Sequence, residues 1–194
     1  MSNPVIKQIP NTLTTLRLLS AAPISLMILS ENYQAVLWIA FFAGITDALD
    51  GWLARKLDCM SRYGAVVDPL SDKALLFGAY ISFVVVGLIP WWIGLVVITR
   101  DIIIVSGALA YHSLIGRYDM APSIWGKVST QVQIVFALML LVHQVYPVFP
   151  QISFLIGILL LVLLAFGSCG HYVFIWGSKA LVAFRDADTE ANNL

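Results

Sequence analysis

Four aspartates lie close together in a stretch of the chain that is otherwise mostly apolar. They are Asp47, Asp50, Asp68 and Asp72, four of the five aspartates in residues 45–73, ITDALDGWLARKLDCMSRYGAVVDPLSDK. Spacings of three and four residues bring side chains onto one face of an α-helix. Two short helical faces can therefore present four carboxylates to one point. A carboxylate within a membrane span costs roughly 2.5 kcal/mol or more, so a group of four needs a compensating charge.

A divalent metal ion is the compensating cation that these four aspartates would bind. Hard oxygen ligands select Mg²⁺, Mn²⁺ or Ca²⁺ over metals that prefer nitrogen or sulfur. Two divalent ions offset four negative charges. Two metal ions about 3.5–4 Å apart are a known arrangement for phosphoryl displacement. The alternative is a structural ion-pair network with Arg55 and Lys73. We disfavour it because two cations cannot balance four anions at low dielectric.

The composition predicts an all-α integral membrane protein. Of the 194 residues, 60% are hydrophobic and only 11% are charged, whereas an ordinary soluble domain carries about 25% charged residues. Because a membrane-spanning helix needs roughly 20 mostly apolar residues, we expect six transmembrane helices. No nucleic-acid partner is expected.

The expected helices form one transmembrane catalytic domain, residues 1–178, followed by a polar cytoplasmic tail, residues 179–194. Their approximate ranges are 12–29, 34–57, 63–88, 90–116, 123–146 and 151–176. Turn-forming residues separate several of them. The short N-terminal segment from Asn3 to Pro10 is either an interfacial amphipathic helix or a disordered lead-in.

The placement of basic residues predicts the orientation. Three loops, residues 30–34, 87–90 and 146–151, contain no Lys or Arg, and the basic residues fall at the other ends of the helices. Because cytoplasmic loops carry the excess of Lys and Arg, both termini are expected in the cytoplasm. The acidic stretch surrounds a cytoplasmic turn, so its site is expected to face the cytosol.

The acidic stretch resembles a known family signature. The pattern D-x2-D-G-x2-A-R-x8-G-x3-D-x3-D is met without a gap by Asp47, Asp50, Gly51, Ala54, Arg55, Gly64, Asp68 and Asp72. This signature is similar to that of the CDP-alcohol phosphotransferase family. Two flanking stretches extend the resemblance: PNxLTxxR, which contains Asn11, Thr14 and Arg17, and GKxxTxxQ, which contains Gly126 and Lys127. The second stretch resembles phosphatidylglycerophosphate synthases.

The resemblance implies an enzyme that transfers a phosphatidyl group from CDP-diacylglycerol to an alcohol and releases CMP. Metal ligands would be Asp47, Asp50, Asp68 and Asp72, holding two Mg²⁺ or Mn²⁺ ions. Asp72 would also be the general base on the incoming hydroxyl. The implied nucleotide-binding residues are Asn11, Thr14, Arg17, Asp50, Gly51, Ala54, Arg55 and Gly64. Arg17 could instead reach the interface by snorkelling. The resemblance also implies a homodimer in the bacterial inner membrane.

The acceptor is predicted from basic residues farther along the chain. Arg100 lies in mid-helix, where an intramembrane charge is functional by default, and Lys127 could join it at an acceptor phosphate. Arg117 is a third candidate, although it also fits a loop charge. The alternatives are a mutually satisfied pair of Arg100 with Asp101, and snorkelling of Lys127. We favour glycerol 3-phosphate as acceptor, with phosphatidylglycerol, and hence cardiolipin synthesis, as the second candidate because the Arg-Asp pair resembles CDP-lipid-using cardiolipin synthases.

Two other functional classes are compatible with intramembrane acids. A divalent-cation or proton-coupled transporter would also use them, but the acidic residues are confined to one end of the expected bundle and no inverted repeat is visible. A non-catalytic assembly factor would be expected to carry a degenerate site, whereas all eight signature positions are present.

Overall fold

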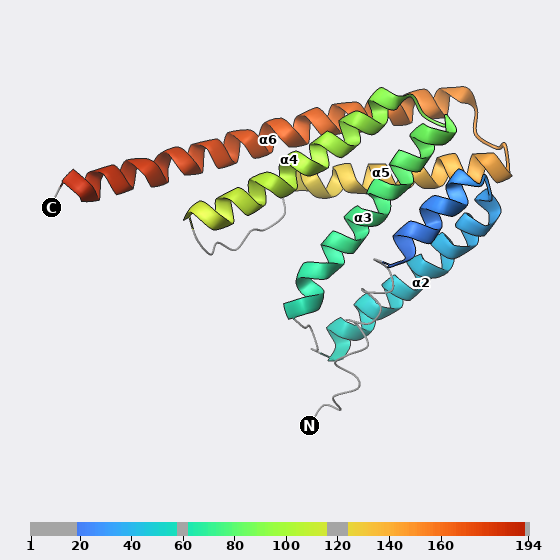
Figure 1. Cartoon of the computed structure of the whole chain (residues 1–194), viewed down its shortest axis with the longest axis horizontal. Helices are drawn as coiled ribbons and strands as arrows, with labels where there is room; N and C mark the ends of the chain where they lie inside the picture. The colour runs from blue at the N-terminus through green and yellow to red at the C-terminus, as the bar shows by residue number, and fades with distance from the viewer. Residues whose placement is uncertain (1–18, 58–61, 116–123, 193–194) are drawn as a thin grey trace. The chain divides into compact units, whose positions relative to one another are not determined.

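The structure is a computed structural model made entirely of helices in the part of the chain that it describes. It describes the backbone of residues 19–57, 62–115 and 124–192, and the side chains of residues 19–46, 71–107, 124–170 and 172. Figure 1 shows the helices, with a first segment, Leu19–Leu29, ahead of the labelled ones. The labelled helices are α2 (Tyr33–Leu57), α3 (Arg62–Val86), α4 (Trp91–Ile115), α5 (Ile124–Val145) and α6 (Gln151–Asn192). These bounds lie close to the expected ranges except at the end of α6.

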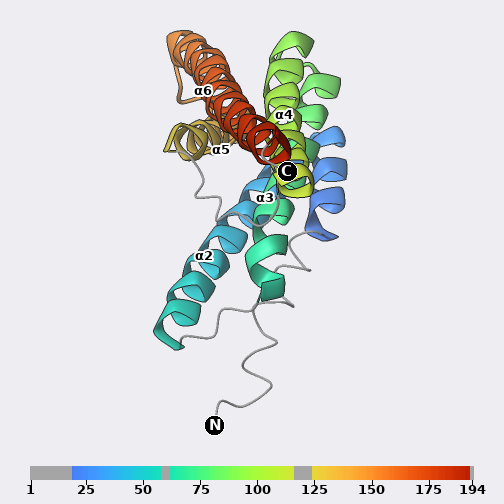
Figure 2. The same ribbon diagram turned by 90° about the vertical axis from the view of Figure 1, so that its left-hand side faces the viewer.

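The helices divide between two compact units. The first unit contains the segment Leu19–Leu29, α2, α3 and the C-terminal part of α5. The second contains most of α4, the N-terminal part of α5, and α6. Within the first unit, α2 and α3 run in opposite directions, as Figures 1 and 2 both show.

Local hydrogen bonds explain where the first two turns form. Gly87 follows α3 with a φ of 83°, a left-handed conformation that glycine adopts without steric cost. The Leu88 N–H donates to the Phe83 carbonyl at 2.9 Å, and the Gly87 N–H donates to the Val84 carbonyl at 3.1 Å. This is the bonding pattern of a Schellman helix end. Before α2, Asn32 caps the helix, with its Oδ1 accepting from the Ala35 N–H at 3.4 Å.

The core of the first unit combines large apolar side chains with a close contact between two helices at Gly78. Ile28, Tyr80 and Phe83 are fully buried. A Cβ atom added at Gly78 of α3 would lie 2.5 Å from Ser25 Oγ. The absence of a side chain at Gly78 therefore lets α3 approach the segment Leu19–Leu29, as small residues do between membrane helices.

Helix α6 exposes a long apolar face. Leu155, Leu159, Leu163 and Phe166 follow one another at helical spacing and are 58–69% exposed. A soluble protein rarely leaves so continuous an apolar stripe uncovered. Within the described residues, Ile124–Val145 and Gln151–Gly170 are also long and apolar enough to cross a bilayer. These features belong to a membrane protein.

Helix α6 continues well beyond the predicted end of the sixth span. The sequence predicts an end near Trp176, before a polar tail, but the helix runs for 42 residues to Asn192. No Gly or Pro follows Gly177, and the segment is rich in Ala and other good helix formers. Hydropathy marks the length of a span, whereas propensity decides where the helix itself ends.

Candidate functional site

The acidic signature lies on two consecutive helices of the first unit. Helix α2 carries positions 47, 50, 51, 54 and 55 toward its C-terminal end, and α3 carries positions 64, 68 and 72 toward its N-terminal end. Positions three or four apart are one helical turn apart. Each helix thus brings its two aspartate positions close together along its own axis.

Only one of the four acidic side chains belongs to the described part of the structure. Asp72 is exposed on the first half of α3. The side chains of Asp47, Asp50, Gly51, Ala54, Arg55, Gly64 and Asp68 lie outside the described side chains, and Asn11, Thr14, Arg17 and Arg117 lie outside the described residues. Among the described side chains, no three potential metal ligands of the His, Cys, Asp or Glu type gather.

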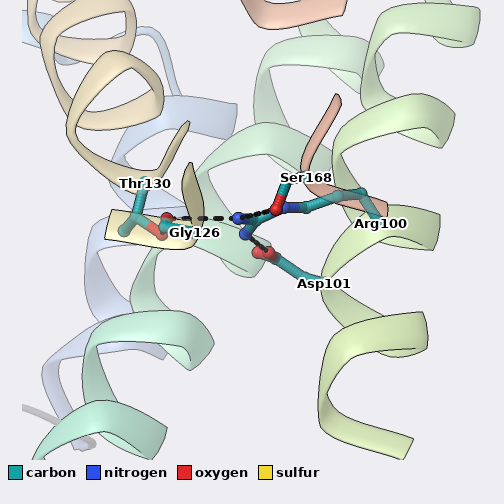
Figure 3. A network of polar contacts seen from close by, with 5 residues as sticks. All are labelled: Arg100, Asp101, Gly126, Thr130 and Ser168. Carbon is teal, nitrogen blue, oxygen red and sulfur yellow. Dashed lines mark hydrogen bonds and ion pairs between the residues drawn. The ribbon is translucent and has the colours of Figure 1, made fainter. Parts of the chain in front are cut away.

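The second unit contains a buried polar cluster around Arg100 of α4 (Figure 3). Arg100 is only 2% exposed. Its Nη1 donates to Asp101 Oδ1 at 2.5 Å, forming an ion pair. Its Nη2 donates to the Gly126 carbonyl at 3.2 Å and to Ser168 Oγ at 3.0 Å. The guanidinium group therefore connects α4 with α5 and α6.

The electrostatics of this cluster follow from its burial. Removing a guanidinium group from water is costly unless a counter-charge and additional hydrogen bonds compensate. Asp101, whose side chain is 16% exposed, supplies the counter-charge. Gly126 and Ser168 supply neutral acceptors. Among the residues that the structure describes, Nε of Arg100 is buried without a hydrogen-bond partner.

The beginning of α5 holds the cluster from one side. The Gly126 carbonyl, which accepts from Arg100, also accepts from Thr130 Oγ1 at 3.1 Å, one turn later. Ser129 is buried in the same region. Lys127 is exposed, so the structure does not bring this predicted acceptor residue into the hydrogen-bonded cluster.

Sequence reasoning did not identify Ser168. It is fully buried in α6 and lies 68 residues from Arg100 along the chain. A local signal was present: Gly167-Ser168-Cys169-Gly170 is a run of small residues after a helix half dominated by Leu, Ile and Phe. Such runs allow close helix contact and polar bonding in membranes, but they do not reveal the partner.

Comparison with known proteins identifies the family. The sequence profile described as CDP-alcohol phosphatidyltransferase matches residues 7–169. This range includes the entire acidic signature, both flanking stretches, Arg100 and Ser168. The chain therefore belongs to the CDP-alcohol phosphatidyltransferase family.

The relatives of this chain carry two kinds of name. A probable phosphatidylglycerophosphate synthase of Mycobacterium tuberculosis is 35% identical over 138 residues, which are 67% of this chain and 64% of that protein. A CDP-diacylglycerol–glycerol-3-phosphate 3-phosphatidyltransferase of Aquifex aeolicus is 34% identical over 63% of this chain and 68% of its own length. A putative cardiolipin synthase of Mycobacterium bovis is 31% identical over 91% of this chain and 81% of its own length. The chain thus spans slightly less than two thirds of the first of these relatives.

Proposed function

We propose that this protein transfers the phosphatidyl group of CDP-diacylglycerol to glycerol 3-phosphate, giving phosphatidylglycerol phosphate and CMP. The observation that carries the proposal is the unbroken acidic signature on α2 and α3, in a chain whose family match covers residues 7–169. The names of the M. tuberculosis and A. aeolicus relatives support this acceptor.

The protein acts as an integral membrane enzyme with six spans and both termini in the cytoplasm. The exposed apolar face of α6 supports membrane insertion. The loops at residues 30–34, 87–90 and 146–151 lack Lys and Arg, which supports their location on the far side. Trp91 and Trp92, exposed at the start of α4, fit that interface. The acidic site then faces the cytosol, in a bacterial inner membrane.

Two divalent ions, Mg²⁺ or Mn²⁺, would be held by Asp47, Asp50, Asp68 and Asp72. The donor set fits, because four carboxylates at one-turn spacings on consecutive antiparallel helices are hard oxygen ligands with a charge of minus four. When bound, such ions stabilise the negative charge that develops on a pyrophosphate undergoing cleavage.

The chain's own residues then bind the nucleotide and activate the acceptor. Asp72 accepts the proton of the incoming hydroxyl as its oxygen bonds to the lipid-linked phosphorus and the bond to the CMP oxygen breaks. Its exposure leaves it accessible to a hydroxyl. Gly51 and Ala54 leave space for the cytidine phosphate, and Arg55 lies near the nucleotide. Asn11, Thr14, Arg17, Asp50 and Gly64 complete this subsite.

Arg100 is the central residue of the proposed acceptor subsite, and Lys127 and Arg117 would add positive charge to it. Arg100 supports this assignment because it is a buried cation whose Nε has no partner among the described residues. An intramembrane charge maintained by three helices is costly to keep, which favours a functional role.

Cardiolipin synthesis, with phosphatidylglycerol as acceptor, is the second candidate. The M. bovis relative carrying that name aligns with 91% of this chain. Asp101 next to Arg100 also favours it, since the pair reduces the net charge available to a phosphate.

A reconstituted assay separates these proposals. The purified full chain receives CDP-diacylglycerol and Mg²⁺ with either glycerol 3-phosphate or phosphatidylglycerol, and CMP release is measured. CMP release with glycerol 3-phosphate alone supports the leading proposal, and release with phosphatidylglycerol alone supports the second. Uptake of a radiolabelled divalent ion into vesicles, without CMP release under any condition, would instead indicate a transporter.

Two substitutions test the roles of the acids in this assay. Asp72→Asn should abolish turnover while largely retaining CDP-lipid binding, and near-normal turnover would exclude Asp72 as the base. Asp47→Asn should weaken metal dependence and CDP-lipid binding together, and an unchanged metal titration would exclude its role as a ligand. Glu31→Gln changes an exposed acid outside the signature and serves as the matched control. Chemical cross-linking in the same membranes tests the proposed homodimer.

A further inference from the structure

We propose that Asp101 is a specificity-determining residue that sets how strongly the Arg100 site binds an anionic acceptor, according to the acceptor's charge. This inference rests on the proposed function, because it takes Arg100 as the acceptor-binding cation. In this role Asp101 is an internal competitor for the guanidinium group, and its effect increases with the negative charge of the acceptor.

The hydrogen-bonding capacity of Arg100 is the first observation. A guanidinium group has five N–H donors. Among the described residues, Arg100 makes three contacts: to Asp101, to the Gly126 carbonyl and to Ser168. Nε remains without a partner among the described residues, although it is buried. A phosphate can therefore gain Nε, but it gains the Nη1 donor now held by Asp101 only by displacing that carboxylate.

The charges of the cluster give the second observation. Arg100 and Asp101 together are neutral, and both are largely removed from water. Gly126 and Ser168 add neutral oxygen acceptors, which contribute no positive charge. An acceptor phosphate entering this environment therefore meets attraction from Arg100 and repulsion of similar range from Asp101. Lys127, which is exposed and follows Gly126 in the sequence, is a cation that can add to the attraction.

The acceptor's charge determines the size of the repulsion. A phosphate monoester carries about −1.5 to −2 charges at pH 7, whereas a phosphodiester carries a single negative charge. Because electrostatic energy scales with the product of the charges, Asp101 weakens monoester binding more than diester binding. The binding of a neutral polyol does not depend on this electrostatic repulsion. Asp101 thus reduces the difference in affinity by which Arg100 favours the more highly charged acceptor.

Binding measurements on the full chain in lipid nanodiscs test this inference. The probes are glycerol 3-phosphate, the diester glycerophosphoglycerol, and glycerol. Asp101→Asn should increase affinity for glycerol 3-phosphate about tenfold and for the diester about threefold, in proportion to charge. Glycerol binding should not change. Asp101→Glu retains the carboxylate and should keep all three affinities within about twofold of wild type.

Two further variants keep the test decisive. Ser106→Ala removes an exposed hydroxyl of α4 that returns to the Ile103 carbonyl, and it should leave all affinities unchanged. If Asp101→Asn does not fold, Asp101→Gln purified with glycerol 3-phosphate present replaces it, since its amide oxygen can still reach Nη1. A gain that is equal for all three probes, or no gain for glycerol 3-phosphate, would overturn the inference.

The binding series also separates this inference from the proposed catalysis. If the wild-type protein releases no CMP but the charge-ordered gain is observed, the catalytic proposal fails and the role of Asp101 stands. If CMP is released but the gain is absent, Asp101 is a structural counter-ion only. A wild-type protein that binds no glycerol 3-phosphate, with an Asn variant that binds none either, also overturns the inference.

Discussion

Two polar contacts between helices of this protein differ in chemistry: one uses neutral groups and the other uses a charge. In the first unit, Ser25, Gly78 and Ser82 join a short helix to α3 through neutral groups. Ser25 Oγ donates to Ala21 O of its own helix at 2.8 Å, and Ser82 Oγ donates to Gly78 O at 2.8 Å. In the second unit, the Arg100 cluster joins α4 to α5 and α6 through a charge.

The two contacts also differ in where the hydrogen-bond partners of each side chain lie. The serine hydroxyls bond mainly to carbonyls of their own helices, so each helix satisfies its own polar groups. Arg100 depends on groups 26 and 68 residues away. A neutral contact of this kind serves packing. A buried charge costs free energy even when it is paired, and this cost supports the proposed role of Arg100 in binding the acceptor.

The largest expected effect comes from removing the charge itself. Arg100→Met leaves Asp101 in a mostly buried environment without its partner, and should reduce the free energy of unfolding by about 3–5 kcal/mol. Unfolding in detergent micelles, followed by circular dichroism, measures the loss. The double variant Arg100→Met/Asp101→Leu removes both charges and should recover most of it. A double variant as unstable as the single one would show that packing, and not charge, dominates the cluster.

The next effect separates the helix connection from the ion pair. Ser168→Ala removes one acceptor of Arg100 Nη2 and leaves Asp101 in place. One Nη2 hydrogen of the buried guanidinium group then lacks its acceptor, while Nη2 still donates to the Gly126 carbonyl, so the loss should be about 2 kcal/mol. Gly167→Ala is the matched control, since an added Cβ there meets nothing within 4 Å. Equal stabilities of these two variants in the same unfolding assay would mean that Ser168 does not hold Arg100.

The sequence predicts the helices better than it predicts these contacts. Asn32, Gly87 and the Pro147–Pro150 stretch mark helix ends through local rules for caps and turns. The acidic signature could be identified because its members lie within two adjacent helices. Ser168 and Arg100 instead meet across 68 residues, and helical periodicity specifies a face without specifying which helix packs on it. The end of α6 was missed because its polar residues are also good helix formers.

A smaller effect tests the close approach in the neutral contact. Gly78→Ala places a Cβ 2.5 Å from Ser25 Oγ, so the hydroxyl must rotate and give up its bond to Ala21. We expect a loss of about 1 kcal/mol in the free energy of unfolding. Adding Ser25→Ala removes the clashing atom and should restore stability.

Gly44→Ala provides the control for the glycine itself. An added Cβ at Gly44 meets nothing within 4 Å, so this variant should be more stable by roughly 0.5–1 kcal/mol through helix propensity alone. If Gly78→Ala gains as much as Gly44→Ala, the two helices do not depend on a small residue at this contact.

The smallest effect is expected at Ser82, and it makes the comparison quantitative. Ser82 is 2% exposed, and its hydroxyl lies 2.8 Å from Gly78 O and 3.3 Å from Ser25 O. Polar contacts between membrane helices average about 0.6 kcal/mol, so Ser82→Ala should cost no more than that. Measured beside Ser168→Ala, it compares one buried serine facing carbonyls with another facing a cation. A loss at Ser82 as large as that at Ser168 would mean that charge does not distinguish the two regions, and the argument for a ligand at Arg100 would lose its energetic basis.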